Sequence, residues 1–247
     1  RSNRGISLTP EGKKLYEHVA IAYEQLQIGE EEIRQNGELE NGLVSIGASE
    51  NALRLVLLSR LEKFHEQYPH VRLRISNHST PQAIQALRSD IVDFAAVTTP
   101  LDIKSPLEKI PLASYREILI GGRKYKKLAE HTQKLEDIAS LPFISLDENS
   151  STRELYNSFF LEQGLSFAPD METATTDQML PLITHNLGIG FYPKKMAELA
   201  LTKGDVYQIP LEEKLPLRRI YLVTNGSTAK STAVRKMIKF IQEYHKI

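Results

Sequence analysis

The sequence predicts a mixed α/β fold with two lobes, preceded by a long N-terminal helix. From Leu43 onward, short apolar runs of strand length alternate with longer amphipathic segments of helix length. The order strand, helix, strand, helix, strand occurs twice, first after residue 43 and again after residue 122. A chain of 247 residues also exceeds the usual size of a single hydrophobic core, so two α/β lobes facing a cleft account for the pattern.

The first predicted element is one helix over residues 9–37. Thr9 is placed to cap its start and Pro10 suits its first position, while Asn36 and Gly37 end it. Its apolar residues follow the alternating spacing of four and three that is typical of a coiled-coil seam: Leu15, Val19, Ala22, Leu26, Gly29 and Ile33. We therefore expect this helix to pair with a partner, with packing against its own domain as the alternative.

The next segment predicts a parallel sheet. The expected strands cover residues 43–48, 71–76 and 92–97, and the expected helices cover 53–68 and 80–88. Strand, helix and strand in this order form right-handed crossovers within one parallel sheet. Two further strands are expected over 107–112 and 117–121.

A second unit is predicted to begin near Gly122. Its expected strands cover 142–146, 170–175, 188–192 and 206–209, and its expected helices cover 135–139, 151–163, 177–186 and 193–202. A strand over 217–224 and a helix over 229–244 close the chain. The helix carries a buried face of apolar residues at helical spacing, as expected for an element that packs on a sheet.

Composition excludes several classes of protein. Lys plus Arg equals Asp plus Glu at 31 each, so most of the surface does not have the basic character of a nucleic-acid-binding protein. The absence of cysteine removes disulfides, thiolate catalysis and cysteine-based zinc sites. No apolar run approaches the roughly 20 residues that span a bilayer, and no signal peptide follows Arg1. We expect a cytoplasmic protein that does not enter a membrane.

Five segments of the sequence resemble landmarks of the LysR-type transcriptional regulators. The run from Arg1 through Arg4-Gly5 to Leu8-Thr9-Pro10-Glu11-Gly12 is similar to the end of the DNA-binding wing in that family, where it leads into the linker helix. The other four resemble parts of the family's effector domain: residues 42–49, residues 61–64 followed by Tyr68-Pro69, residues 143–153, and residues 187–193. The resemblance covers the whole chain.

The resemblance implies a two-lobed fold like that of type 2 periplasmic binding proteins, and a regulator that is not an enzyme. It divides the chain into the end of a DNA-binding wing (1–8), a linker and dimerisation helix (9–37), a first effector lobe (43–121 and 217–247) and a second effector lobe (122–216), with lobe crossings near Gly121 and Pro216. The rest of the winged helix-turn-helix is expected outside this chain. It further implies a homodimer through Leu15, Val19, Ala22, Leu26 and Ile33, commonly a homotetramer, and DNA contacts by Arg1 and Arg4. The alternative for these two arginines is a solvated basic terminus.

Hydroxyl side chains follow the carboxyl ends of the predicted strands, where ligands bind in open parallel sheets. With one arginine, they form the candidate effector site: Ser49, Ser79, Thr80, Thr98, Thr99, Ser151, Thr152 and Arg153. Helix N-termini attract anions, and Arg153 is suited to grip a carboxylate. The sequence therefore predicts a small anionic or strongly polar metabolite as ligand. The alternative for the hydroxyls is helix capping, and for Arg153 a surface ion pair.

Two other functions fit the same fold. A solute-binding protein of a transport system is the main alternative, but it predicts a signal peptide or lipid anchor and no dimerising helix. An enzyme would need a nucleophile, an acid–base pair or a metal set. The seven histidines are scattered without metal-ligand spacing, and no nucleophile elbow or complete nucleotide-binding motif occurs. We expect no metal and no cofactor.

Overall fold

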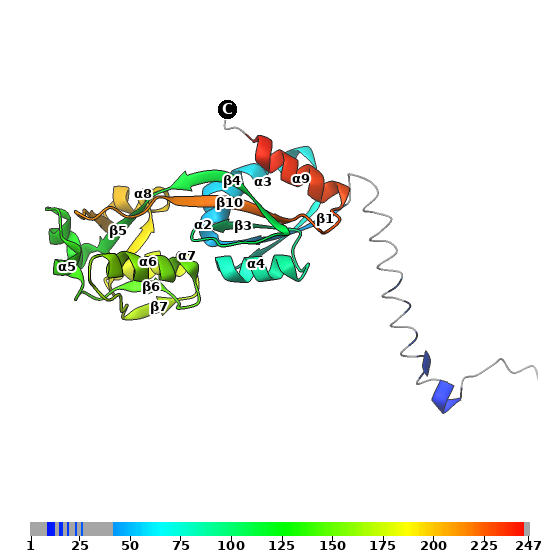
Figure 1. The fold of residues 1–247 in the computed structure, drawn as a ribbon, viewed down its shortest axis with the longest axis horizontal. Helices are drawn as coiled ribbons and strands as arrows, with labels where there is room; N and C mark the ends of the chain where they lie inside the picture. Colours follow the sequence, from blue (N-terminus) through cyan, green and yellow to red (C-terminus); the bar gives the residue numbers. More distant parts are fainter. Residues whose placement is uncertain are drawn as a thin grey trace, which may run out of the picture.

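The computed structural model describes residues 9–12, 15, 16, 19, 23, 26 and 42–244. Residues 42–244 form two adjoining α/β lobes, each built around its own sheet (Figure 1). Within the described part of the chain, no helix has both the length and the apolar character needed to cross a membrane. The two lobes contact each other through helical segments, which include α2 (Glu50–Ala52) against α7 (Thr176–Thr184) and η1 (Leu53–Leu57) against α8 (Lys194–Lys203).

The first lobe contains a five-stranded sheet in the order β2-β1-β3-β10-β4. Its strands are β1 (Leu43–Ala48), β2 (Arg72–Asn77), β3 (Phe94–Thr98), β4 (Leu107–Tyr115) and β10 (Arg218–Asn225). The first three strands are parallel, and β10 runs antiparallel between β3 and β4. All of β3 and nearly all of β1 are buried, as their continuous apolar runs predict.

Helices cover both faces of this sheet. They are α2 (Glu50–Ala52), the π-helical turn η1 (Leu53–Leu57), α3 (Leu58–Gln67), α4 (Thr80–Arg88) and α9 (Thr232–Glu243). One hydrophobic cluster joins η1, α3 and α9 to one face, around Leu57, Phe64 and Met237. A separate cluster joins α4 to the opposite face through Ala83 and Leu87. The amphipathic spacing seen in the sequence therefore corresponds to these two buried helix faces.

The second lobe repeats this plan. Strands β5 (Glu117–Gly122), β8 (Ile189–Pro193) and β9 (Val206–Ile209) form one sheet, and β6 (Ile144–Leu146) and β7 (Met171–Thr173) form a parallel pair. A bridge between Phe143 and Ile189 connects the two sets of strands. The order β7-β6-β8-β5-β9 thus matches β2-β1-β3-β10-β4 in the first lobe. In each order the fourth strand, β5 or β10, is the one with which the chain enters that lobe from the other lobe. This agrees with the repeated element order in the sequence.

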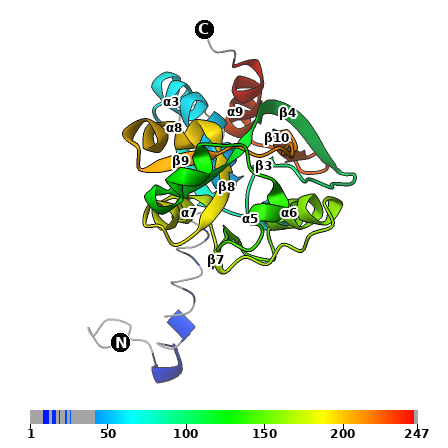
Figure 2. The ribbon, with the colours of Figure 1, turned by 90° about the vertical axis from the view of Figure 1, so that its left-hand side faces the viewer.

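The helical segments of the second lobe are η2 (Arg123–Ala129), α5 (Leu135–Ile138), α6 (Ser151–Glu162), α7 (Thr176–Thr184) and α8 (Lys194–Lys203). Figure 2 looks onto this lobe and shows α6, α7 and α8 arranged around its strands. A cluster rich in phenylalanine packs α5 and α6 on one face of the sheet, and a second cluster packs α7 and α8 on the other.

The first lobe crossing lies earlier than the expected position near Gly121. Strand β4 belongs to the first sheet up to Tyr115, whereas β5 pairs with β8 and β9 of the second sheet from Glu117 onward. Residues 117–121 therefore belong to the second lobe, which corrects the expected boundary. The reason is that β5 is fully buried and is apolar from Ile118 onward, and such a run suits either sheet equally well.

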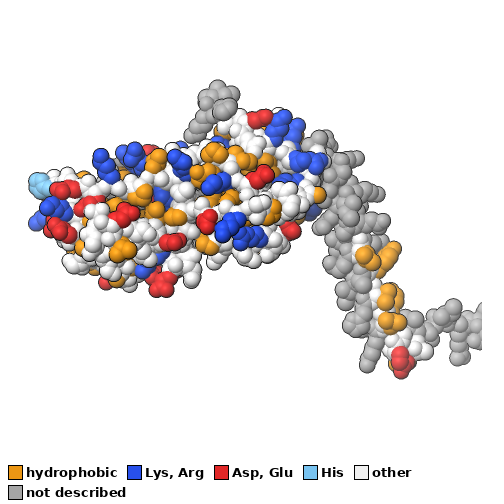
Figure 3. Space-filling view, in the orientation of Figure 1, with side chains coloured by type: hydrophobic (Ala, Val, Ile, Leu, Met, Phe, Trp, Pro, Cys, Tyr) orange, Lys and Arg blue, Asp and Glu red, His pale blue; other side chains and the backbone are white. Residues whose placement is uncertain are grey.

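The described residues of the N-terminal segment are helical from Pro10 onward. The Gly12 amide donates to the Thr9 hydroxyl at 3.0 Å, so Thr9 caps this start. Its described apolar side chains are exposed in the single chain: Leu15, Tyr16, Val19, Tyr23 and Leu26. Figure 3 shows hydrophobic side chains on the surface of this segment. Arg1, Arg4, Ala22 and Ile33, also named in the sequence-based predictions, lie outside the described residues.

Candidate functional site

Four helices point their N-termini into one cavity between the lobes. The N-cap residues of α2 and α4 are Ser49 and Ser79, and those of α6 and α7 are Ser150 and Thr175. All four line a cavity of about 40 Å³, which we call the cleft cavity. Its other lining residues are Glu50, Asn51, Asn77, His78, Thr80, Thr98, Leu146, Ser151, Thr152, Ala174 and Thr176.

The structure brings together six of the eight predicted site residues: Ser49, Ser79, Thr80, Thr98, Ser151 and Thr152. Some of their hydroxyls already have partners. Ser49 accepts from the Ala52 amide at 3.3 Å as the cap of α2, and Thr80 donates to the Thr98 carbonyl at 3.1 Å. The capping role considered for the hydroxyls thus applies to Ser49, while Thr80 ties α4 to β3.

The other two predicted residues do not line this cavity. The Thr99 hydroxyl accepts from the Arg219 amide at 3.0 Å at the edge of β10. Arg153 is buried within the second lobe, where its Nη1 contacts Glu172 Oε1 at 2.7 Å and its guanidinium lies over the Phe167 ring. The expectation that Arg153 grips a ligand carboxylate is therefore corrected, because a carboxylate of the chain already holds it.

A buried ion pair forms the wall behind the cleft cavity. Arg218 Nη1 contacts Glu117 Oε2 at 3.0 Å, and the side chains are 1% and 2% exposed. Arg218 Nη2 also donates to the Thr98 hydroxyl at 3.1 Å and to the Thr152 hydroxyl at 3.0 Å. The Arg218 guanidinium thus bonds to the first lobe through Thr98 and to the second lobe through Thr152. Its ion pair with Glu117 also joins the two places where the chain crosses between the lobes.

Two tyrosines complete this wall. The Tyr156 hydroxyl donates to Glu117 Oε2 at 2.9 Å, and the Asn51 amide donates to the Tyr115 hydroxyl at 3.2 Å. Burial raises the pKa of Tyr115 to about 12, with the nearby Glu117 adding to the shift. Burial acts to lower the pKa of Arg218, but Glu117, Tyr115 and Tyr156 together outweigh it and raise that pKa, so the guanidinium stays charged.

The cleft cavity also holds polar groups that are open to a ligand. Asn51 is 4% exposed, and its Oδ1 has no hydrogen-bond partner among the described residues. Glu50 contributes one carboxylate, which accepts from the Asn77 amide at 3.1 Å. Burial and, secondarily, Asp177 raise the pKa of Glu50. Glu50, Asn51 and Arg218 were not predicted as site residues, because each acquires its role through a partner distant in sequence.

The cleft cavity widens toward solvent between α4 and α6. A hollow of about 480 Å³ lies there, and Thr80 and Ser151 line both it and the cleft cavity. Over residues 42–244 and the few described residues before them, no group of three or more His, Asp or Glu side chains is arranged to hold a metal ion. The chemistry on offer is hydrogen bonding by hydroxyls, amides and helix N-termini.

A family model of the LysR substrate binding domain matches residues 37–246. The chain belongs to this family. The match confirms the resemblance noted in the sequence, and it favours a regulator over a transport protein.

Curated relatives of this LysR-family chain are transcriptional regulators. The HTH-type transcriptional regulator CzcR of Bacillus subtilis is 23% identical over 244 residues, which cover 99% of this chain and 81% of that protein. A probable RuBisCO transcriptional regulator of Trichormus variabilis is 24% identical, with 94% of this chain and 71% of that protein covered.

Solved structures share the fold. The effector binding domain of QuiR in complex with shikimate has a TM-score of 0.72 at 19% identity, covering 83% of this chain and 97% of that one. The regulatory domain of CcmR from Synechocystis PCC6803, in complex with 2-PG, has a TM-score of 0.72 at 14% identity, covering 82% and 96%. The predicted two-lobed fold, like that of periplasmic binding proteins, is thereby confirmed.

Proposed function

We propose that this LysR-family chain senses a small anionic or strongly polar metabolite in the cleft cavity and thereby controls DNA binding and transcription. The observation that carries the proposal is the convergence of four helix N-termini on one cavity. Each N-terminus offers unpaired N–H groups and about half a unit of positive charge. Together they outweigh the single lining carboxylate, Glu50, whose raised pKa makes it easier to neutralise.

The size of the cleft cavity supports a change of shape on binding. Its volume of about 40 Å³ is far below the roughly 300–1,000 Å³ typical of ligand sites. A metabolite of several heavy atoms therefore requires the lobes to separate, or must reach the cavity from the wider hollow beside it. A ligand that binds the separated state better shifts the population of lobe arrangements, which is the physical basis of gating.

In this proposal, ligand binding changes the geometry of a dimer or tetramer on DNA. The exposed apolar side chains at Leu15, Val19 and Leu26 support pairing through the N-terminal helix. DNA is contacted through a winged helix-turn-helix whose last residues are 1–8, with Arg1 and Arg4 on the phosphate backbone or in the minor groove. The proposed protein acts in the cytoplasm and catalyses no reaction.

A charge placed in the cleft cavity tests the ligand class. We would titrate the chain with shikimate, inorganic phosphate and small dicarboxylates by thermal shift and calorimetry. Ser151→Asp adds a carboxylate in the first turn of α6, where it favours the helix but repels an anionic ligand. We expect an anion that stabilises the parent chain to lose nearly all of its effect on this variant.

Ser158→Asp is the matched control, because it adds the same charge to an exposed position of α6 two turns away. It should bind the anion as the parent does. Equal binding by both variants, or stabilisation of the chain by neutral or cationic metabolites only, would contradict an anion site at these helix N-termini.

A further inference from the structure

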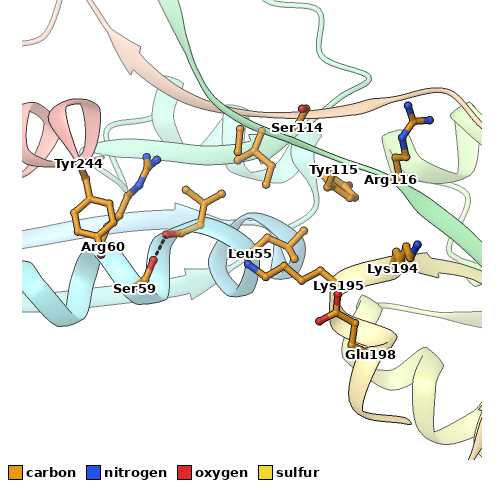
Figure 4. A pocket seen from close by; sticks show the side chains of 13 residues that line it. Leu55, Ser59, Arg60, Ser114, Tyr115, Arg116, Lys194, Lys195, Glu198 and Tyr244 are labelled. Carbon is orange, nitrogen blue, oxygen red and sulfur yellow. Dashed lines mark hydrogen bonds between the residues drawn. The ribbon is translucent and has the colours of Figure 1, made fainter. Parts of the chain in front are cut away.

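A second hollow lies at the chain crossings, and no part of the proposed function uses it. Its volume is about 410 Å³, within the usual range of ligand sites. The first lobe contributes η1, α3, β4 and β10, and the second lobe contributes the first turns of α8 (Figure 4). In Figure 1, α9 lies above the crossing strands, and α4 and α6, which flank the cleft, lie below them. We call this second hollow the hinge pocket.

Cations dominate the rim of the hinge pocket. Arg60, Arg116, Lys194 and Lys195 line it, against the single carboxylate of Glu198. Among the described residues, none of these four cations has a carboxylate within ion-pair distance. The pocket therefore carries a net positive charge that the described part of the chain does not neutralise, which favours an anionic ligand.

Arg60 is the most enclosed of these cations. Its Nη1 donates to the Ile241 carbonyl at 2.9 Å, and its guanidinium lies 5.7 Å from the centre of the Tyr244 ring. Burial lowers the pKa of Arg60, an effect that Tyr244 partly opposes. Its remaining N–H groups have no hydrogen-bond partner among the described residues, so they are available for a carboxylate or sulfonate.

The middle of the hinge pocket is apolar. Leu55 and Val56 of the π-helical turn form one wall, and Ala113 and Ile220 of the sheet form the other. Figure 4 shows Leu55 between the Arg60 end and the end that holds Arg116 and Lys194. Val56 and Ile220 are already buried, so Leu55 and Ala113 provide most of the accessible apolar surface. A hydrated inorganic ion would leave this surface in water, whereas a ligand with an apolar body would cover it.

From this combination we infer that the hinge pocket binds a small organic anion: a carboxylate or sulfonate on an aromatic or aliphatic body. The site is separate from the cleft cavity, and it is lined by four formal positive charges, whereas none of the described lysines and arginines lines the cleft cavity. Because both lobes contribute lining residues, the occupant also contacts both lobes at once.

The test uses the whole 247-residue chain and two fluorescent probes of nearly equal shape. 8-Anilino-1-naphthalenesulfonate carries both the anion and the apolar body, and N-phenyl-1-naphthylamine lacks the sulfonate. The double variant Lys194→Gln, Lys195→Gln removes two pocket charges from exposed positions. The control Lys127→Gln, Lys203→Gln removes two exposed lysines of the same lobe that do not line the pocket.

We expect saturable binding of the sulfonate with one site that the pocket variant weakens by about fivefold or more, whereas the control leaves it unchanged. The uncharged probe should bind more weakly and respond to neither variant. Ala113→Trp fills the pocket from an exposed strand position without altering a charge, so it should block the sulfonate as well.

Equal sulfonate affinity in the parent, the pocket variant and Ala113→Trp would overturn the inference, as would equal affinity for the two probes. Thermal unfolding of each variant shows that the comparison concerns folded protein. The result does not depend on whether the cleft cavity binds a metabolite, so this inference and the proposed function fail or stand separately.

Discussion

The cleft cavity and the hinge pocket attract negative charge in two different ways. The cleft cavity uses neutral hydroxyls and four helix N-termini held rigidly by the fold, in about 40 Å³. The hinge pocket uses the formal charges of long side chains, three of them exposed, around a volume of about 410 Å³. Backbone dipoles cannot reorient without unfolding a helix, whereas lysine and arginine side chains adapt to the ligand and are screened by salt. The difference suggests a selective site in the cleft and a more tolerant one at the hinge.

The two hollows share one wall. Tyr115 lines the hinge pocket, and its hydroxyl accepts a hydrogen bond from Asn51, which lines the cleft cavity. Arg218 and Glu117 lie behind the cleft cavity at the same crossing. Breaking this wall is the most severe way to test whether the two hollows are distinct.

Glu117→Gln should produce the largest effect. It leaves Arg218 buried without a matching charge, and removing one partner of a buried ion pair costs about 3–5 kcal/mol of unfolding free energy. Urea unfolding measures the loss. The double variant Glu117→Gln, Arg218→Met removes both charges and should recover much of it. A loss below about 1 kcal/mol in the single variant would show that the wall does not depend on this pair.

Alkaline pH should weaken the same wall through Tyr115. In the unfolded chain this phenol ionises at its ordinary pKa of about 10, whereas in the folded chain its pKa is about 12. Between these values the folded state holds a proton that the unfolded state has released, so the free energy of unfolding falls as pH rises. Urea unfolding across this window should show a steeper decline for the parent than for Tyr115→Phe. Equal slopes would contradict the burial of this phenol.

A smaller effect on the free energy of unfolding should distinguish two neighbouring serines of the cleft cavity, of which Ser150 caps a helix and Ser151 is available to a ligand. The Ser150 hydroxyl accepts from the Arg153 amide at 3.1 Å, so Ser150→Ala should cost about 1 kcal/mol of stability. Ser151→Ala is the matched control, because its hydroxyl has no hydrogen bond within the described residues, and it should change stability by less than about 0.5 kcal/mol. If Ser151→Ala were the more destabilising change, the roles assigned to these neighbours would be reversed.

Elements defined by local pattern could be predicted from the sequence, and their spatial partners could not. The alternation of strands and helices follows from residue periodicity, which is why the buried strands β1 and β3 were expected close to their observed positions. Residues 117–121 were assigned to the wrong lobe because the choice between two sheets depends on β8 and β9, at least 68 residues later, counted from Gly121 to Ile189. No local signal specifies such a pairing.

The same limit applies to the site. Hydroxyls at strand ends indicate the cleft, since the carboxyl ends of parallel strands meet at one edge of a sheet. Arg218 carries no such signal, because an arginine beside Arg219 resembles an exposed strand start, and its burial depends on Glu117, 101 residues earlier. Arg153 was misjudged for a similar reason, since its partner Glu172 lies 19 residues further on.

The position of β10 in the first sheet has a consequence for synthesis of the chain. The second lobe is a continuous insertion whose last strand, β9, ends at Ile209, whereas the first sheet needs β10 between β3 and β4. During translation the later-encoded lobe has all of its strands before the earlier-encoded one does, which reverses the usual N-terminal-first order. Until β10 leaves the ribosome, the facing edges of β3 and β4 lack the strand that joins them. A chain that ends shortly after Ile209 and has been released from the ribosome would therefore expose the first lobe, and not the second, to chaperones and proteases.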